Sequence, residues 1–123
     1  MKRGKPLERR TRLRSRRATP RRSERVYDPA YRAWVRRQPC AARALPGHRC
    51  DGPIEGDHTG RRAMGRKADD ATMIALCQLA HQQRDAFHGV FATFDHDAMR
   101  AWLDAQVADH QARYARAATA RPA

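Results

Sequence analysis

The residues best suited to chemistry lie in one stretch between residues 57 and 88. Asp57 and His58 stand side by side on a predicted strand, and His81 follows on a predicted helix. Neighbouring strand residues point to opposite faces, so Asp57 and His58 should do different jobs. A carboxylate suits Mg²⁺ or Mn²⁺, and an imidazole suits Zn²⁺ or Ni²⁺. We therefore predict that Asp57 and His81 form a mixed, open site for a divalent metal.

His58 is the candidate general base, because a histidine side chain titrates close to neutral pH and can take a proton from water. His88 follows His81 by seven residues, or two helical turns, so it is a less secure metal ligand, provided the helix extends that far. Gly89 indicates a helix end at this point, and the alternative role for His88 is a favourable interaction with the helix dipole.

The formal net charge of +13 predicts a polyanionic partner, with nucleic acid the default. Residues 1–25 hold twelve Lys or Arg against two Glu, a net +10, and lack hydrophobic periodicity. We expect this arm to be disordered and favour a role as a DNA tether, with a solubilising basic tail of no specific role as the alternative. Its candidate contacts are Arg9, Arg10, Arg12, Arg14, Arg16 and Arg17. A second group, in the glycine-rich loop after His58, would hold phosphates beside the metal: Arg61, Arg62, Arg66 and Lys67.

The stretch resembles the HNH, or ββα-metal, nucleases, most closely the small endonucleases of phages and prophages. The resemblance rests on Asp57-His58, on the run Met64–Asp70 (MGRKADD) and on Leu76-Cys77, and it covers roughly residues 40–94. It implies metal-dependent hydrolysis of DNA, with His58 as base and with Asp57 and His81 as metal ligands. Ala80 stands where the family commonly has a histidine, and Thr72 stands near the position of the asparagine that gives the motif its middle letter.

Three cysteines, Cys40, Cys50 and Cys77, are candidates for one structural Zn²⁺, with His48 or His81 as the fourth ligand. The alternatives are buried free thiols, or a disulfide between Cys40 and Cys50 formed on oxidation. Glu55 shares a strand face with Asp57 and is either solvated or an outer partner of the metal site. His48, His96 and His110 are otherwise expected at the surface.

The remaining patterns predict a single α+β domain over residues 26–118, in which a ββα-metal centre is flanked by helices, followed by a frayed end at 119–123. A helix starts at Asp28-Pro29 and ends by Pro39, with Trp34 as a core anchor. A last helix over roughly 96–117 starts at Asp95. Its alanine-rich end, Gln106 to Arg116, should project from the body or pair with a second copy in a homodimer.

The expected function is a DNA endonuclease of phage or prophage DNA processing or recombination. The main alternative is a catalytically inactive DNA-binding protein with a structural Cys/His site, and a further one is an RNA- or ribosome-associated basic protein. The chain has no run of about 20 apolar residues and nothing that resembles a signal peptide, which predicts an intracellular, cytoplasmic protein without a membrane partner.

Overall fold

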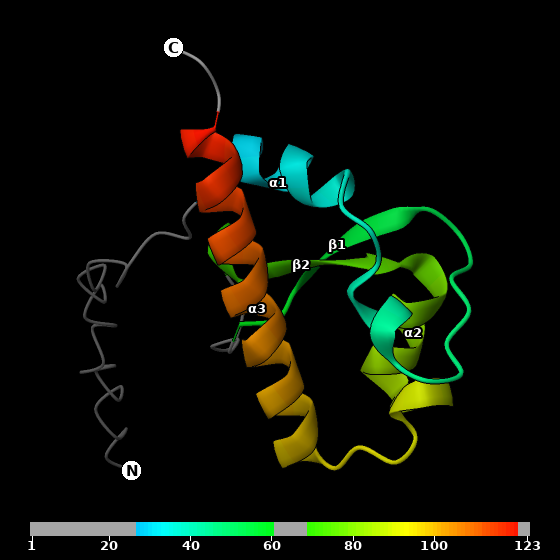
Figure 1. Cartoon of the computed structure of the whole chain (residues 1–123). Coiled ribbons are helices and arrows are strands. Elements are labelled where there is room, and N and C mark those ends of the chain that lie inside the picture. The colour runs from blue at the N-terminus through cyan, green and yellow to red at the C-terminus, as the bar shows by residue number, and fades with distance from the viewer. Residues whose placement is uncertain (1–26, 61–68, 121–123) are drawn as a thin grey trace, which may run out of the picture.

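The computed structural model describes residues 27–60 and 69–120, which form a small α+β unit (Figure 1). The basic arm, the loop cations Arg61, Arg62, Arg66 and Lys67, and the last three residues lie outside the described residues. The predicted order of strand, strand and helix is confirmed: β1 spans Ile54–His58, β2 spans Met73–Cys77, and α2 follows directly as Gln78–Ala86. Short 3₁₀ turns lie at Ala41–Ala44, Asp70–Thr72 and Gly89–Phe91.

The two strands form an antiparallel pair in which His58 faces Met73 and Ile54 faces Cys77. Gly56 is required where the strand passes Met73, because a Cβ atom at Gly56 would lie 2.3 Å from the Met73 sulfur. The glycine thus lets the backbone of β1 pass close to the Met73 side chain.

Strand β2 is buried along its whole length because both of its faces are covered. Ile74 and Leu76 pack in one core with Phe91 and Leu103. Met73 and Ala75 point the other way, into a second core. That second core contains Tyr31, Trp34 and Val35. A strand enclosed in this way holds the neighbouring strand β1, and with it Asp57 and His58, in a fixed position.

Helix α1, Pro29–Arg36, begins as the sequence predicts. Pro29 occupies the first turn, and the Asp28 carboxylate accepts the Tyr31 backbone N–H at 3.0 Å. Trp34 is buried, so its predicted role as a core anchor is confirmed.

Helix α3, His96–Thr119, begins at the predicted cap, Asp95, but its second half does not project. Tyr114 packs against Tyr31 and Trp34, with ring centroids 5.1 and 5.3 Å apart, so the helix end lies against α1 (Figure 1). The predicted projection of residues 106–116 is wrong, because aromatic residues of α1 supply an apolar surface for this face of the helix.

The prediction that His110 lies at the surface is also wrong: its side chain is fully buried. Its Nε2 accepts the backbone N–H of Ala75 at 3.1 Å, and its Nδ1 lies 2.8 Å from the Gln106 carbonyl oxygen. Two such bonds fix a neutral ring with the proton on Nδ1. His110 thus satisfies a donor on the edge of β2 that β1 does not use.

Candidate metal and base site

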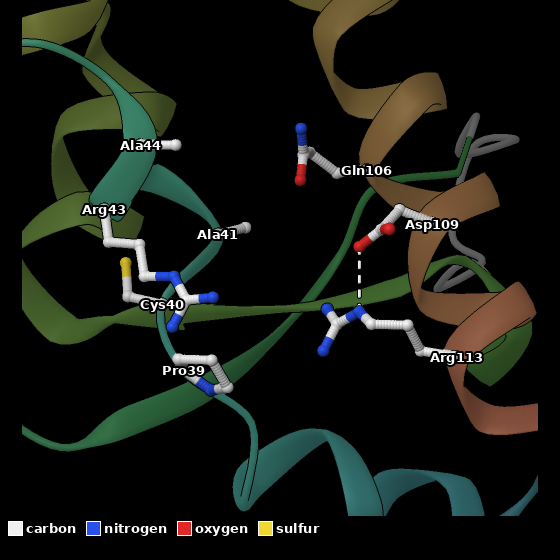
Figure 2. A pocket seen from close by; sticks show the side chains of 8 residues that line it. All are labelled: Pro39, Cys40, Ala41, Arg43, Ala44, Gln106, Asp109 and Arg113. Carbon is white, nitrogen blue, oxygen red and sulfur yellow. Dashed lines mark hydrogen bonds and ion pairs between the residues drawn. The ribbon is translucent and has the colours of Figure 1, made fainter. Parts of the chain in front are cut away.

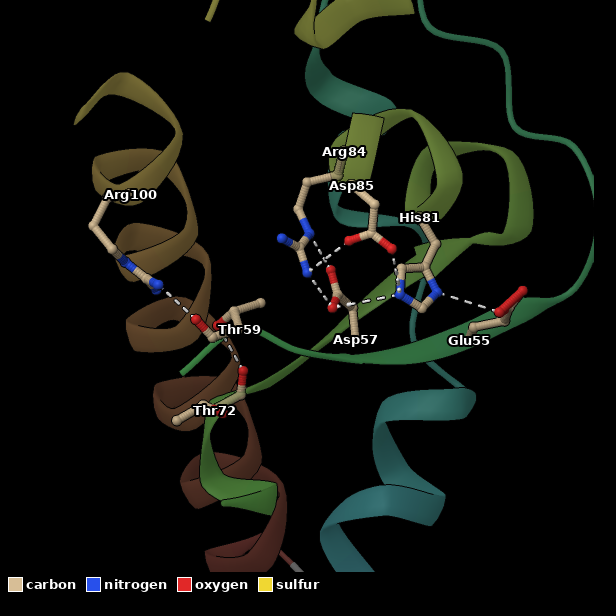
Figure 3. Close-up of polar contacts among 8 residues, drawn as sticks. All are labelled: Glu55, Asp57, Thr59, Thr72, His81, Arg84, Asp85 and Arg100. Atoms are coloured by element: carbon tan, nitrogen blue, oxygen red, sulfur yellow. Dashed lines mark hydrogen bonds and ion pairs between the residues drawn. The ribbon is translucent and has the colours of Figure 1, made fainter. Parts of the chain in front are cut away.

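Asp57 lies on the face of β1 that is turned toward α2, and only 1% of it is exposed. Both of its carboxylate oxygens accept hydrogen bonds from the Arg84 guanidinium, through Nε and a terminal nitrogen (Figure 3). Its Oδ1 is also 3.5 Å from Nε2 of His81. Burial alone would raise the pKa of Asp57, but hydrogen bonds from His81 and Arg84 and the Arg84 charge lower it below its ordinary value. Asp57 is therefore a buried carboxylate that stays ionised.

His81 lies between two carboxylates (Figure 3). Its Nε2 faces Asp57, and its Nδ1 is 3.3 Å from an oxygen of Glu55. The hydrogen bond with Asp57 is the largest effect on the ring and, against the cost of burial, raises the pKa of His81 to about 9, with help from Glu55. Asp85, one turn further along α2, lies 3.9 Å from the same Nε2. The predicted shared face of Glu55 and Asp57 is confirmed.

The Asp57 and His81 donors fit a shared divalent ion. Ligand bonds to Mg²⁺ or Zn²⁺ are about 2.1 Å long, so two donors on one ion lie at most about 4.2 Å apart. The observed 3.5 Å meets this limit. A metal-bound histidine usually gives its other N–H to a carboxylate, and Glu55 stands at that position. The donor chemistry of this pair therefore suits a metal.

His58 faces away from this group and contacts Asp70. Its Nε2 is 2.8 Å from Oδ1 of Asp70, which is completely buried. The second oxygen of Asp70 accepts the backbone N–H of Asp28 at 2.8 Å, which ties this carboxylate to the start of α1. The prediction that Asp57 and His58 point to opposite faces of the strand is confirmed, since Asp57 contacts His81 and Arg84 while His58 contacts Asp70.

The two ends of the segment that joins the strands are held together. The Thr59 backbone N–H and side-chain hydroxyl both donate to the Thr72 carbonyl oxygen, at 3.2 and 2.8 Å. Arg100 of α3 donates to the Thr59 carbonyl oxygen at 2.6 Å (Figure 3). The chain thus leaves β1 and returns to β2 at a fixed point directly after His58.

His88 lies beyond α2, which ends at Ala86 with Phe87 in the left-handed conformation. The helical spacing that related His88 to His81 therefore does not apply. The His88 side chain is exposed, and none of the contacts described around Asp57 and His81 involves it. Arg84 and Asp85 do take part, and i+3 and i+4 spacing from His81 on a helix is the signal that could have found them.

A second cluster brings together Cys40, His48, Cys50 and Cys77. One donor atom from each residue lies within 4.8 Å of all the others, so the four could hold a metal ion. His48 Nε2 is 3.8 Å from the sulfur of Cys40 and 3.5 Å from that of Cys77. Of the two predicted fourth ligands, the structure brings His48 to the cysteines and His81 to Asp57. His48 is half-buried here, contrary to the expected surface position.

The cysteines differ in their environments, and all three are free thiols. Burial raises the pKa of Cys40 to about 11. Burial also opposes ionisation of Cys77. Hydrogen bonds to its sulfur, above all those from backbone groups of Ala80 and Asp51, outweigh the effect of burial and lower the pKa of Cys77. Cys77 caps α2, since its sulfur accepts the Ala80 N–H at 3.4 Å. The helix that carries His81 thus begins at a member of this cluster.

A cavity of about 260 Å³ lies between the 3₁₀ turn at Ala41–Ala44 and α3. Figure 2 shows Arg43 and Cys40 on one side of it, opposite Asp109 and Arg113 of α3. Arg113 is already paired with Asp109 at 2.9 Å. The cavity adjoins the cysteine cluster, and its lining does not include Asp57, His58 or His81.

Comparisons with protein-family models, with curated proteins and with solved structures found no match to this chain. In the described ranges, no helix is long and apolar enough to cross a membrane.

Proposed function

We propose that this protein is a metal-dependent DNA endonuclease of the HNH type, in which Asp57 and His81 hold a divalent ion and His58 is the general base. The observation that carries the proposal is the sequence of contacts from Glu55 to His81 to Asp57. A carboxylate that fixes one nitrogen of a histidine, while the other nitrogen faces a second ligand, is the usual arrangement around a catalytic metal.

The His58–Asp70 pair supports the role of base. A buried carboxylate that accepts one N–H of an imidazole fixes the tautomer and orients the ring. Asp70 would therefore keep the proton on Nε2, and Nδ1 would take the proton from the attacking water. With 15% of its side chain exposed, His58 is partly open to solvent.

When bound, a divalent ion would stabilise the negative charge that develops on the phosphate in the transition state. Mg²⁺ or Mn²⁺ suits Asp57, and Zn²⁺ or Ni²⁺ suits His81. The net charge of +13 supports DNA as the substrate, because cations that neutralise phosphates supply most of the affinity of such proteins.

The alternative is a DNA-binding protein without catalytic activity, and one specific observation favours it. Arg84 already pairs with both oxygens of Asp57, so this carboxylate has a full counter-charge without a metal. On this alternative, Asp57 and Arg84 form a structural ion pair between β1 and α2.

Plasmid cleavage separates the two functions. Supercoiled DNA is incubated with the wild type and His81→Ala in EDTA, Mg²⁺, Mn²⁺ or Zn²⁺, with His96→Ala as the matched control because His96 is an exposed histidine away from the site. We expect divalent-dependent cleavage by the wild type and by His96→Ala, and little by His81→Ala. Equal cleavage by all three proteins would indicate a contaminant and contradict the enzyme proposal.

The same assay on His88→Ala tests the third predicted ligand. If His88→Ala loses metal-dependent cleavage to the same extent as His81→Ala, His88 is a metal ligand.

We also propose that the cysteine cluster holds one structural Zn²⁺, because three thiolates and one imidazole form a complete tetrahedral set for this ion. Metal analysis of the purified protein should give one zinc per chain, and the zinc should persist in His81→Ala and be lost in Cys77→Ser. Zinc that is lost in His81→Ala but kept in Cys77→Ser would reverse the assignment.

A further inference from the structure

Arg84 holds the carboxylate that the proposed function assigns to the metal. Its guanidinium bonds to both oxygens of Asp57, in the fork geometry that makes arginine–carboxylate pairs strong. The pair is protected from solvent, since 14% of the Arg84 side chain and 1% of that of Asp57 are exposed. Arg84 follows His81 by three residues on α2, so both side chains reach Asp57 from the same helix face (Figure 3).

The contacts on one oxygen atom bring Arg84 and the metal position into conflict. Asp57 Oδ1 accepts a hydrogen bond from the terminal nitrogen of Arg84 and is also the atom that faces His81 Nε2. An ion shared by Asp57 Oδ1 and His81 would therefore lie next to the Arg84 guanidinium. Two cations on one buried oxygen repel each other strongly, because little water is present to screen them.

Arg84 has a second anionic neighbour on the open side of the site. The same terminal nitrogen is 3.4 Å from an oxygen of Asp85, whose side chain is 60% exposed. Asp85 therefore offers a second carboxylate, on the solvent side, to a guanidinium that leaves Asp57. Arginine binds phosphate oxygens with the same fork geometry that it uses for carboxylates. The solvent side is also the direction from which DNA must approach.

We propose that Arg84 and the divalent ion compete for Asp57: Arg84 occupies this carboxylate in the metal-free protein, and its guanidinium moves to the phosphate of the substrate when the ion binds. This inference rests on the proposed function, because it requires Asp57 and His81 to be the metal ligands. Arg84 is then both a barrier to metal binding and a cation that binds the scissile phosphate.

Calorimetry with Mn²⁺ on the full chain tests the competition, since hard Mn²⁺ prefers the oxygen-containing site to the cysteines. Arg84→Gln removes the competitor, so it should bind Mn²⁺ more tightly than the wild type. Coupling between two ligands is usually about 5- to 150-fold, and the gain should fall in this range. The matched control is Arg116→Gln, which removes the same charge at an exposed position near the end of α3 and should leave the affinity unchanged.

Weaker or unchanged Mn²⁺ affinity in Arg84→Gln would overturn the inference. A loss of about 10- to 100-fold would mean that Arg84 only orients Asp57 for the metal, as outer partners of metal sites usually do. His81→Ala separates this failure from that of the proposed function. If wild-type Mn²⁺ affinity does not depend on His81, the metal site itself is wrongly assigned.

A second measurement needs no substitution and holds even where Arg84→Gln fails to fold. Because coupling is reciprocal, binding of the ion must weaken the contact between Arg84 and Asp57. The Nε–H resonance of Arg84 in the wild-type protein should therefore shift toward that of a solvent-exposed arginine during Mg²⁺ titration, with the same midpoint as calorimetry carried out with Mg²⁺. A resonance that stays unchanged at saturating Mg²⁺ would overturn the inference.

Discussion

Replacement of Asp70 by asparagine should stop catalysis and preserve the fold. One Asp70 oxygen lies 2.8 Å from His58 Nε2, and the other accepts the Asp28 backbone N–H at 2.8 Å. Asparagine has the same shape but only one acceptor oxygen, and its NH₂ group can only donate. The backbone N–H of Asp28 can also only donate, so the new oxygen must face Asp28. The NH₂ group must then face His58.

The size of the effect follows from this orientation. An NH₂ group that donates to Nε2 moves the ring proton of His58 to Nδ1, the nitrogen that the proposed mechanism needs as the acceptor. The same exchange in the serine-protease triad lowers turnover by about 10⁴, and loss of a general base usually costs about 10²- to 10⁴-fold. We therefore expect the single-turnover rate of Asp70→Asn to fall by about 10²- to 10⁴-fold.

The assay is single-turnover cleavage of labelled DNA at saturating protein, with DNA affinity and thermal unfolding measured in parallel. Affinity and melting temperature should stay close to the wild type, because the bond to Asp28 is kept. Asp69→Asn is the matched control, since it removes an exposed carboxylate from the adjacent position. Wild-type cleavage by Asp70→Asn would refute the role of Asp70 in fixing the His58 tautomer.

Two further predictions concern the arm and the buried histidine. Residues 1–25 carry a net charge of +10, and if half of this charge contacts phosphates, their removal should reduce the slope of log K against log salt by about 4 or 5. Turnover at saturating DNA should stay intact. An unchanged slope would exclude the arm as the tether. Burial lowers the pKa of His110, so the unfolded chain takes up the proton first and stability should fall as the pH drops below about 6.5, by at most about 1.4 kcal/mol per pH unit. The difference in urea unfolding free energy between the wild type and His110→Gln should shift against the wild type between pH 7 and 5.5, because this comparison cancels the opposite contribution of His81, whose pKa is raised. A difference that does not change with pH would assign the dependence to other groups.

Local signals predicted the elements that position the site. Asp28-Pro29 and Asp95 mark the helix starts because capping depends on a few adjacent residues. Alternation along β1 placed Glu55 with Asp57 and opposite to His58, because the strand period depends on the backbone alone. The same alternation led to the prediction that Asp57 is a metal ligand and His58 a base on the opposite face.

Contacts made at a distance in the chain could not be predicted in the same way. His48 joins the cysteines from an irregular loop, where no spacing rule applies. His110 lies in an alanine-rich helix segment whose sequence indicates exposure, and its burial depends on distant partners, the Ala75 N–H on β2 and the Trp34 ring on α1. Asp70 meets His58 because the chain returns beside the end of β1. Arg84 could be placed on the face of His81, but its partner could not, because many carboxylates compete for an arginine.

The most direct test of the proposed nuclease is the single-turnover rate of His58→Ala in saturating Mg²⁺ or Mn²⁺, measured together with its affinity for the same DNA. If His58 is the general base and Asp57 and His81 hold the metal, the rate should fall by about 10²-fold or more while affinity stays close to that of the wild type. A wild-type cleavage rate in His58→Ala would contradict the proposed mechanism, and loss of DNA binding together with cleavage would make His58 a structural residue.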